Sequence, residues 1–405
     1  MRYGAPAVER AMKIQEILLR AMSGKITWLQ AADILGLSPR TVRRWRARYE
    51  RHGYDGLLDR RGRQPSPRRV PLAEVERVLR LYRERYMGFN VRHFLEIARR
   101  EHGVRLSYSF VRQALQGAGL VAKRRPRGRH RLRREPRACV GELLHLDGSP
   151  HAWLALVPDA RQTLIAVVDD ATTRVLYAQL HDTESTETVM TALATVFVEV
   201  GLPMALYTDR AGWAFYTPKA GGAVDKTKLT QVGRALKRLG VEHIPAYSPQ
   251  ARGRSERLNR TFQDRLVNEL RVAEIATTEA ANAYLRTTFL PTHNATFTRV
   301  PRDPASAFVT LGLSVDLEQI LCHEEERTVG KDNTVVVGSL CLQVPKQPGR
   351  PSCEGLRVLV RRHLSGEHTV WRGTQLLGRY ATPQPPPRRP KRTDHLSNQP
   401  VTFTC

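Results

Sequence analysis

The sequence predicts a multidomain protein that combines all-α units, an α/β core with a mixed sheet, and a small all-β domain. Three observations predict this fold class. Apolar residues recur at helical spacing in residues 8–51 and 72–121, strand-like and helical runs alternate between residues 141 and 309, and strand-like runs alone return at residues 325–380. With 405 residues, 41% of them hydrophobic, the chain is long enough for about two to four domains with real cores.

The charge of the chain predicts a polyanionic partner. The 65 Lys and Arg residues outnumber the 39 Asp and Glu residues, which gives a formal net charge of +26 and a pI near 10.6. A membrane surface is the competing polyanion, but no apolar run approaches the roughly 20 residues that span a bilayer, and the N-terminus lacks the apolar segment of a signal peptide. We therefore expect nucleic acid as the partner and no membrane, and the helix-turn-helix predicted at residues 8–51 narrows this to double-stranded DNA.

The cysteines predict neither a disulfide framework nor a zinc site. They are odd in number, scattered and never spaced as C-x-x-C: Cys139, Cys322, Cys341, Cys353 and Cys405. Lone thiols in a reducing cytoplasm are the expectation.

Residues 8–51 predict three short helices arranged as a helix-turn-helix. Thr27 with Gln30 forms a capping box, and Ser38 followed by Pro39 starts the third helix. That helix has an apolar face of Val42, Trp45 and Tyr49. Its other side carries four arginines that we expect to bind DNA in the major groove: Arg40, Arg43, Arg44 and Arg51. The alternative is a small helical bundle whose arginines are merely solvated.

Two basic linkers flank a second helical unit. Residues 52–71 are rich in Arg, Gly and Pro and suit an arm lying along DNA, although a flexible linker also fits. Residues 72–121 predict three helices that form a second, helix-turn-helix-like DNA-binding domain, for which protein contacts compete with DNA contacts. Residues 122–137 carry nine Lys or Arg against one Glu, which indicates a DNA-binding linker or a solvated hinge. The linker arginines expected on DNA are Arg61, Arg63, Arg124 and Arg125.

Residues 138–310 predict the α/β core. Three strands in succession, followed by alternating helices and strands, indicate a mixed sheet with helices on its faces. The strands are expected at 142–147, 163–169, 174–180, 204–208 and 242–246, and the helices at 185–200, 227–239 and 252–271. Residues 325–380 predict a small β-barrel or sandwich that is basic enough to touch DNA. The Pro- and Arg-rich residues 381–405 are expected to be disordered.

Three acidic residues are the candidate catalytic and metal-binding groups. Asp147 and Asp209 each follow a short apolar run, so they meet if their strands are neighbours. Glu256 opens a long helical pattern and shares a helix face with Asn259, Arg260 and Gln263. The packing stripe of that helix lies roughly 120° away and consists of Leu258, Phe262, Leu266 and Leu270.

Three carboxylates held together repel one another unless cations neutralise them. Oxygen ligands select hard cations, so the expected cofactor is Mg²⁺ or Mn²⁺, with two ions per active site. Two such ions about 3.5–4 Å apart activate the attacking oxygen and stabilise the leaving oxygen of an in-line phosphoryl transfer. A basic chain with these acids therefore predicts a metal-dependent enzyme acting on nucleic acid.

Four motifs carry a family resemblance: LDGSPH at 146–151, VVDDAT at 167–172, YTDR at 207–210 and SPQARGRSERLNRT at 248–261. In order and context they resemble those of bacterial insertion-sequence transposases of the D-D-E type, whose retroviral-integrase-like core has a ribonuclease H fold. The resemblance covers roughly residues 10–310.

The resemblance implies binding of the terminal repeats of an insertion sequence, 3′-end cleavage and strand transfer into target DNA by at least a dimer. It also implies that Asp147 contacts both metal ions, with Asp209 and Glu256 completing one shell each, and that the DNA end is contacted by Gln250, Asn259 and Arg260. The sequence leaves two rivals open. One is a non-catalytic or domesticated DNA-binding repressor, and the other is a structure-specific nuclease.

Several features depart from the family pattern or invite another interpretation. The interval from Asp209 to Glu256 is longer than usual, with an extra stretch around 217–228. Asp169 and Asp170 precede a turn-like sequence and are expected to be turn-forming and solvated. The acids at 182, 184 and 187 are expected to begin a helix. His145 is expected to pack or to support the site rather than to bind metal.

Overall fold

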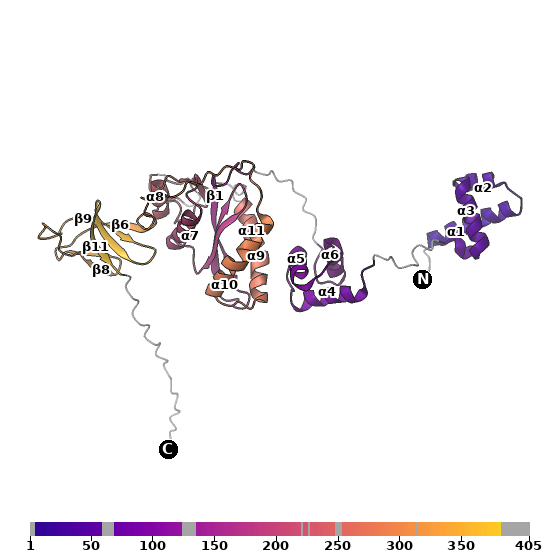
Figure 1. Ribbon diagram of the computed structural model, residues 1–405, viewed down its shortest axis with the longest axis horizontal. Coiled ribbons are helices and arrows are strands. Elements are labelled where there is room, and N and C mark those ends of the chain that lie inside the picture. The colour runs from indigo at the N-terminus through magenta and orange to yellow at the C-terminus, as the bar shows by residue number, and fades with distance from the viewer. Residues whose placement is uncertain are drawn as a thin grey trace, which may run out of the picture. The chain divides into compact units, whose positions relative to one another are not determined.

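The computed structural model describes residues 5–58, 69–123, 135–219, 222–225, 227–247, 253–312 and 314–381 (Figure 1). The chain forms two compact units, Met1–Val78 and Leu79–Cys405. Among the described helices, none combines the length and apolarity needed to cross a membrane. The four cysteines in the described part are free thiols, and Cys405 lies outside it.

The first unit contains the predicted helix-turn-helix. It consists of α1 (Ala5–Met22), α2 (Trp28–Leu35), α3 (Pro39–His52) and the 3₁₀ turn η1 (Gly53–Leu57). The predicted caps are present, because the Thr27 hydroxyl accepts from Gln30 N at 3.2 Å and Ser38 caps α3 ahead of Pro39. Gly36 ends α2 at φ 63°, a left-handed conformation that glycine adopts without strain. The core of this unit includes Ile14, Ile17, Leu18, Ala21, Ala31, Ala32 and Val42.

The second helical region comprises α4 (Leu72–Glu84), α5 (Val91–His102) and α6 (Tyr108–Gly117). Helix α5 contacts α9 (Gly253–Val272) of the core. His93 Nε2 lies 2.7 Å from Glu269 Oε1, and Arg265 Nη1 lies 2.8 Å from Glu96 Oε2. Of the two kinds of contact that the sequence left open for this region, the structure therefore shows protein contacts on α5.

The core is built on the predicted mixed sheet, with strands ordered β3-β2-β1-β4-β5. The strands are β1 (Leu144–His151), β2 (Gln162–Asp169), β3 (Val175–His181), β4 (Ala205–Thr208) and β5 (Glu242–Pro245). β1, β2 and β3 pair antiparallel, whereas β1–β4 and β4–β5 pair parallel. All five strands lie within three residues of the bounds expected from the sequence, except that β1 extends to His151.

Helices cover both faces of this sheet (Figure 1). One face packs on α7 (Thr186–Glu199) and α8 (Gln231–Arg238), and the other packs on α9 and the helices after it. Those later helices are α10 (Thr278–Tyr284), a π-helical turn η3 (Leu285–Phe289) and α11 (Leu290–Phe297). Five described residues between positions 311 and 321, where the sequence predicted no element, also pack on the α7–α8 side: Leu311, Val315, Leu317, Ile320 and Leu321.

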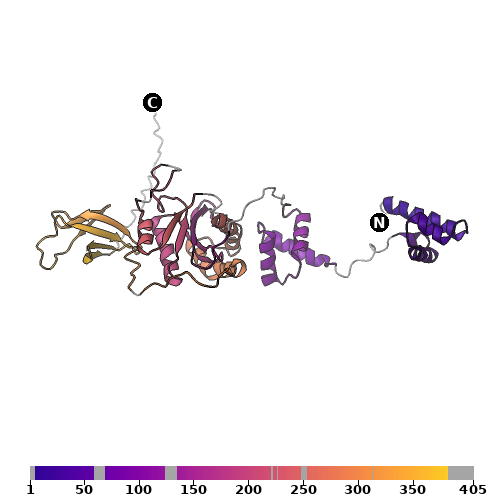
Figure 2. The same cartoon turned by 90° about the horizontal axis from the view of Figure 1, so that it is seen from above.

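The C-terminal strands form two antiparallel sheets around one apolar core. The four-stranded sheet has the order β11-β10-β9-β6, and β7 pairs with β8. The strands are β6 (His323–Thr328), β7 (Thr334–Val337), β8 (Leu340–Gln343), β9 (Arg357–Arg362), β10 (His368–Arg372) and β11 (Gln375–Tyr380). Figures 1 and 2 show the strands of the larger sheet side by side. Val335, Val358, Val360 and Val370 are among the buried residues between the sheets.

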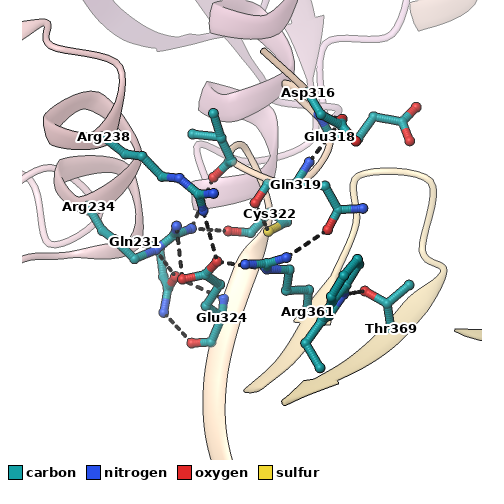
Figure 3. A network of polar contacts seen from close by, with 12 residues as sticks. Gln231, Arg234, Arg238, Asp316, Glu318, Gln319, Cys322, Glu324, Arg361 and Thr369 are labelled. Carbon is teal, nitrogen blue, oxygen red and sulfur yellow. Dashed lines mark hydrogen bonds and ion pairs between the residues drawn. The ribbon is translucent and has the colours of Figure 1, made fainter. Parts of the chain in front are cut away.

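A polar network joins this all-β region to the core (Figure 3). Glu324 of β6, whose side chain is 12% exposed, pairs with Arg234 of α8 at 3.0 Å and with Arg361 of β9 at 2.9 Å. Gln231 exchanges two hydrogen bonds with the Glu324 backbone, at 2.8 and 3.0 Å. Arginines of α8 and of β9 thus share one largely buried carboxylate, which ties α8 to the β-domain.

Candidate active site

Strand β1 divides its side chains between the two faces of the sheet. Leu144 and Leu146 lie in the apolar cluster with α7 and α8. Because side chains alternate along a strand, His145, Asp147 and Ser149 point the other way, toward α9. Asp147 is buried, with 8% of its surface exposed. The candidate catalytic acid thus lies between the sheet and α9.

Helix α9 makes two polar contacts with this face of β1. Asn259 Nδ2 donates to Asp147 Oδ2 at 2.9 Å, and Gln263 Nε2 donates to Ser149 Oγ at 3.1 Å. A step of four residues along α9 thus matches a step of two residues along β1. The helix and the strand therefore run in the same direction where they contact each other. The sequence assigned Asn259 to DNA, and the structure places its amide nitrogen on Asp147.

Strand pairing brings Asp147 level with Asp209. β1 and β4 are parallel neighbours, with Leu144 opposite Leu206 and His145 opposite Tyr207. The same offset, continued by two residues, sets Asp147 level with Asp209, which directly follows β4. Asp209 is half-buried and accepts a hydrogen bond from Ala211 N at 3.0 Å. The sequence predicted that Asp147 and Asp209 meet if their strands are neighbours, and the two strands are neighbours in the sheet.

Glu256 lies on the side of α9 that faces the β4 edge. At about 100° per residue, Glu256 is about 60° to one side of Asn259 and Phe262 about 60° to the other. Phe262 packs with residues of β2 and β3, and β4 is the neighbour of β1 on the opposite side. Glu256 is therefore on the Asp209 side of the helix, in the first turn, where it is exposed.

The expected packing stripe of α9 is present, since Phe262, Leu266 and Leu270 are fully buried and Leu258 is partly buried. Within the described residues, no three His, Cys, Asp or Glu side chains are gathered closely enough to hold a metal ion. Asp147 and Asp209 are brought level, whereas Glu256 is not gathered into such a group with them.

The donor atoms of the site fit a hard cation. Carboxylate and amide oxygens are the ligands that Mg²⁺ and Mn²⁺ prefer. Asn259 Oδ1 is buried and has no hydrogen-bond partner among the described residues. Its carbonyl oxygen therefore lies unsatisfied beside Asp147, where a cation or its water would satisfy it.

Asp169 and Asp170 correct one expectation. Both form the turn after β2, as predicted, but neither is solvated, since they are 2% and 0% exposed. Asp169 Oδ2 accepts from Thr172 N and Oγ1 at 2.8 and 2.6 Å, and its Oδ1 accepts from Gly141 N at 3.0 Å. Hydrogen-bond donors within the fold thus replace water around the carboxylate.

Asp170 pairs with charged side chains from two other elements. His145 Nε2 and Arg254 Nε each lie 2.7 Å from Asp170 Oδ1, and Arg137 N donates to Oδ2 at 2.7 Å. Burial alone raises the pKa of the Asp170 carboxyl, but the hydrogen bonds from His145 and Arg137 and the charges of His145 and Arg254 outweigh it, so the pKa is lowered. His145 thus pairs with Asp170 on the face of β1 that carries Asp147.

Glu184 makes a contact with β1 that the sequence did not reveal. Helix α7 begins at Thr186 with Ser185 as its cap, and only the acid at 187 lies in its first turn. Glu184 instead accepts a hydrogen bond from Trp213 Nε1 at 2.7 Å. Its carboxylate packs on Gly148, where an added Cβ would overlap it. An acid just before a helix cap resembles any helix-start acid, so the sequence held no sign of this contact.

The extra stretch before Glu256 folds back beside Asp209. Arg210 donates to the Gly222 carbonyl at 2.6 Å, and its guanidinium carbon lies 5.2 Å from the centre of the Tyr247 ring. The Lys228 ammonium lies 4.9 Å from the Tyr216 ring. Among the described residues, the longer interval thus brings the Gly222 carbonyl and the Tyr247 ring against Arg210, the residue after Asp209.

Apart from Asn259, which is partly buried and contacts Asp147, the candidate DNA contacts fall into two groups. Five are exposed in the structure: Arg40, Arg43, Arg44 and Arg51 on α3, and Arg260 on α9. The residues Arg61, Arg63, Arg124, Arg125 and Gln250 lie outside the described residues.

Comparison with known proteins identifies relatives of this chain. A helix-turn-helix domain family matches residues 15–65, and a homeodomain-like domain family matches residues 41–115. The putative transposase y4bF of Sinorhizobium fredii is 33% identical over 327 residues, which cover 80% of this chain and 71% of that protein. The transposase for insertion sequence IS1202 of Streptococcus pneumoniae is 28% identical over 371 residues, 82% of this chain and 78% of that protein.

One solved structure is a distant match, a simian T-cell lymphotropic virus intasome in complex with the PP2A regulatory subunit B56 gamma. It covers 75% of this chain and 96% of its own chain at 14% identity, with a TM-score of 0.33, which is too low to support an argument about the fold. The sequence similarity to the two transposases identifies the family. The chain belongs to the transposases of bacterial insertion sequences.

Proposed function

We propose that this transposase binds the terminal repeats of an insertion sequence and catalyses metal-dependent 3′-end cleavage and strand transfer into target DNA. The observation that carries the proposal is the arrangement of Asp147 on β1, Asp209 level with it after β4, and Glu256 on the adjoining side of α9. The sheet order, with three antiparallel strands followed by two parallel ones, supports a ribonuclease-H-like core.

In this proposal the carboxylates of Asp147, Asp209 and Glu256 would hold two Mg²⁺ or Mn²⁺ ions. Bound ions supply a more acidic water and neutralise the charge on the leaving oxygen. The chain's own residues position the reactants: Asn259 orients the Asp147 carboxylate, and Arg260 is exposed one residue further along α9 to face the DNA end. Positioning of this kind accounts for most of the catalysis of phosphoryl transfer.

The proposed reaction has two balanced steps. In the first, a water oxygen attacks phosphorus, the bond from phosphorus to the 3′ oxygen breaks, and that oxygen takes a proton. In the second, the freed 3′-OH attacks a phosphodiester of target DNA and displaces another 3′ oxygen. No external oxidant or energy source is needed, because each step exchanges one bond from phosphorus to oxygen for another.

DNA recognition is assigned to the N-terminal region. The exposed arginines of α3, namely Arg40, Arg43, Arg44 and Arg51, are placed on a helix-turn-helix, where the second helix of the motif enters a major groove. The linker arginines would add phosphate contacts. Two element ends must be joined in one event, so a homodimer or higher oligomer on DNA is part of the proposal, in the cytoplasm at the nucleoid.

The test uses the purified chain, Mg²⁺ and labelled duplexes taken from the ends that flank its own gene. Wild-type protein is expected to nick the 3′ end and to join it to target DNA, and Asp147→Asn and Glu256→Gln are expected to bind the ends without doing either. Tight binding without cleavage by the wild type would favour the repressor. Cleavage without any joined product would favour the nuclease.

A further inference from the structure

Asp170 is a buried carboxylate outside the proposed triad that connects three segments of the core. Its side chain is fully buried, and it contacts His145 of β1, Arg254 of α9 and the backbone of Arg137. A carboxylate without water is stable only when charges and donors around it are fixed. The segments that supply those partners are therefore held to the turn after β2.

Arg254 brings the first turn of α9 into this arrangement. Its side chain is 18% exposed, and it lies two residues before Glu256. The first turn of a helix has backbone N–H groups without partners inside the helix, so it is the part most prone to fray. An ion pair at this position restrains the turn that carries Glu256.

The Asp170 contacts extend the alignment of α9 with β1. Gln263 contacts Ser149 and Asn259 contacts Asp147. Further toward the start of the helix, Arg254 reaches His145 through the shared carboxylate of Asp170. A helical turn of about 5.4 Å and two strand residues of about 6.6 Å are similar lengths, so the three links follow one another in order along both elements.

We propose that Asp170 and Arg254 are positioning residues that set the orientation of Glu256 relative to Asp147. Asp170 does so from both sides, because it fixes His145 on the strand of Asp147 and Arg254 on the helix of Glu256. The inference rests on the proposed function, since Glu256 must be catalytic for its orientation to matter.

The neighbouring Asp169 provides a matched control. It is similarly buried and sits in the same turn, but its carboxylate accepts hydrogen bonds from Gly141 and Thr172 rather than from α9. Asp169→Asn should therefore weaken the turn without changing how α9 is held.

The experiment compares Arg254→Gln, Arg254→Lys, Asp170→Asn and Asp169→Asn in the full chain. Three quantities are measured: end binding, cleavage rate at saturating DNA and metal, and hydrogen exchange of peptides from residues 253–262 without metal. Arg254→Gln and Asp170→Asn are expected to lower the cleavage rate about 10–100-fold, to leave end binding unchanged and to speed exchange in the first turn of α9. Arg254→Lys keeps the charge and should recover most of both losses.

Each result separates the inference from the proposed function. Wild-type cleavage and exchange in Arg254→Gln and Asp170→Asn, while Asp147→Asn is inactive, would overturn the inference alone. Equal effects of Asp169→Asn on rate and exchange would also overturn it, because they would reflect general weakening of the turn. Full cleavage by Asp147→Asn or Glu256→Gln would overturn the proposed function, and the role of this pair with it. Thermal unfolding of each variant verifies that it is folded. If Arg254→Gln does not fold, the comparison of Arg254→Lys with Asp170→Asn still tests the inference.

Discussion

The two faces of strand β1 differ in what surrounds the side chains of residues 144–149. On one face, Leu144 and Leu146 lie in an apolar cluster with α7 and α8. On the other, His145, Asp147 and Ser149 each have a polar partner, and two of those partners come from α9. One strand of alternating side chains thus contributes stability on one side and the candidate chemistry on the other.

The difference teaches how the two faces are specified. The apolar face depends on volume and burial, which many combinations of residues satisfy. The polar face depends on particular partners, because a buried donor or acceptor left alone costs about 1–3 kcal/mol. Substitutions on the two faces should therefore affect different observables.

The largest expected effect is on activity, from Asp147→Asn. Losing a metal-binding carboxylate removes several kcal/mol of transition-state stabilisation, which corresponds to at least about a thousandfold in rate. The amide introduced by this substitution still offers an oxygen to Asn259, so the free energy of unfolding should change by no more than about 1 kcal/mol. Joining assays and urea unfolding measure the two quantities, and a large loss of stability would contradict the division between the faces.

The adjacent residue should show the opposite pattern. Leu146→Ala removes a side chain that is 2% exposed, so we expect a loss of about 2–5 kcal/mol in the free energy of unfolding. At temperatures where the variant is folded, its cleavage rate per folded molecule should match the wild type. A specific loss of cleavage with unchanged stability would show that the apolar face also takes part in the chemistry.

Acid should weaken the α9 side of the core through His293. Burial, together with the charge of Arg265, lowers the pKa of His293 from 6.5 to about 4. The unfolded chain therefore takes up a proton first, and stability is lost as the pH falls from about 6.5 toward 4. His293→Phe should remove about 2 kcal/mol of the loss between pH 7 and pH 4.5. Equal losses in both proteins would contradict this assignment.

The smallest expected effect is at Gly148, where the Glu184 carboxylate packs directly against the strand. In Gly148→Ala the new methyl group must displace that carboxylate, which breaks the bond from Trp213 and costs about 1 kcal/mol. The same substitution is also made in a Trp213→Phe variant, which lacks the hydrogen bond to Glu184 from the start. If Gly148→Ala costs as much in the Trp213→Phe background, the Glu184–Trp213 contact is not what the methyl group disturbs.

The sequence predicted the strands and the apolar stripe of α9 well because both follow from local periodicity. Alternation identified β1 and β2, and the spacing of Phe262, Leu266 and Leu270 placed one face of α9 in the core. The helices at 278–297 were missed, since this stretch is rich in threonine and contains Pro291. It is helical through packing of Ala281, Leu285 and Phe289 on the sheet, which local propensity does not reveal.

The candidate site was predictable only in part. The three acids and their helix face were visible in the motifs, and the neighbouring positions of β1 and β4 follow from the sheet order. The contacts of Asp170 with Arg254 and of Glu184 with Trp213 join residues far apart in the chain. Asp170 was expected to be solvated because a turn sequence does not show which side chains will later cover it.

We proposed that Asp147, Asp209 and Glu256 bind the catalytic metal ions directly. Replacing each carboxylate oxygen ligand by a cysteine sulfur tests this most directly. Each acid is replaced in turn by cysteine, and joining of labelled ends is measured with Mg²⁺ and with Mn²⁺. A thiolate is a poor ligand for Mg²⁺ and a better one for the softer Mn²⁺. We predict that each cysteine variant is inactive with Mg²⁺ and regains joining with Mn²⁺, whereas Asp169→Cys shows no such switch. Equal activity with both metals at any of the three positions would contradict direct metal binding there.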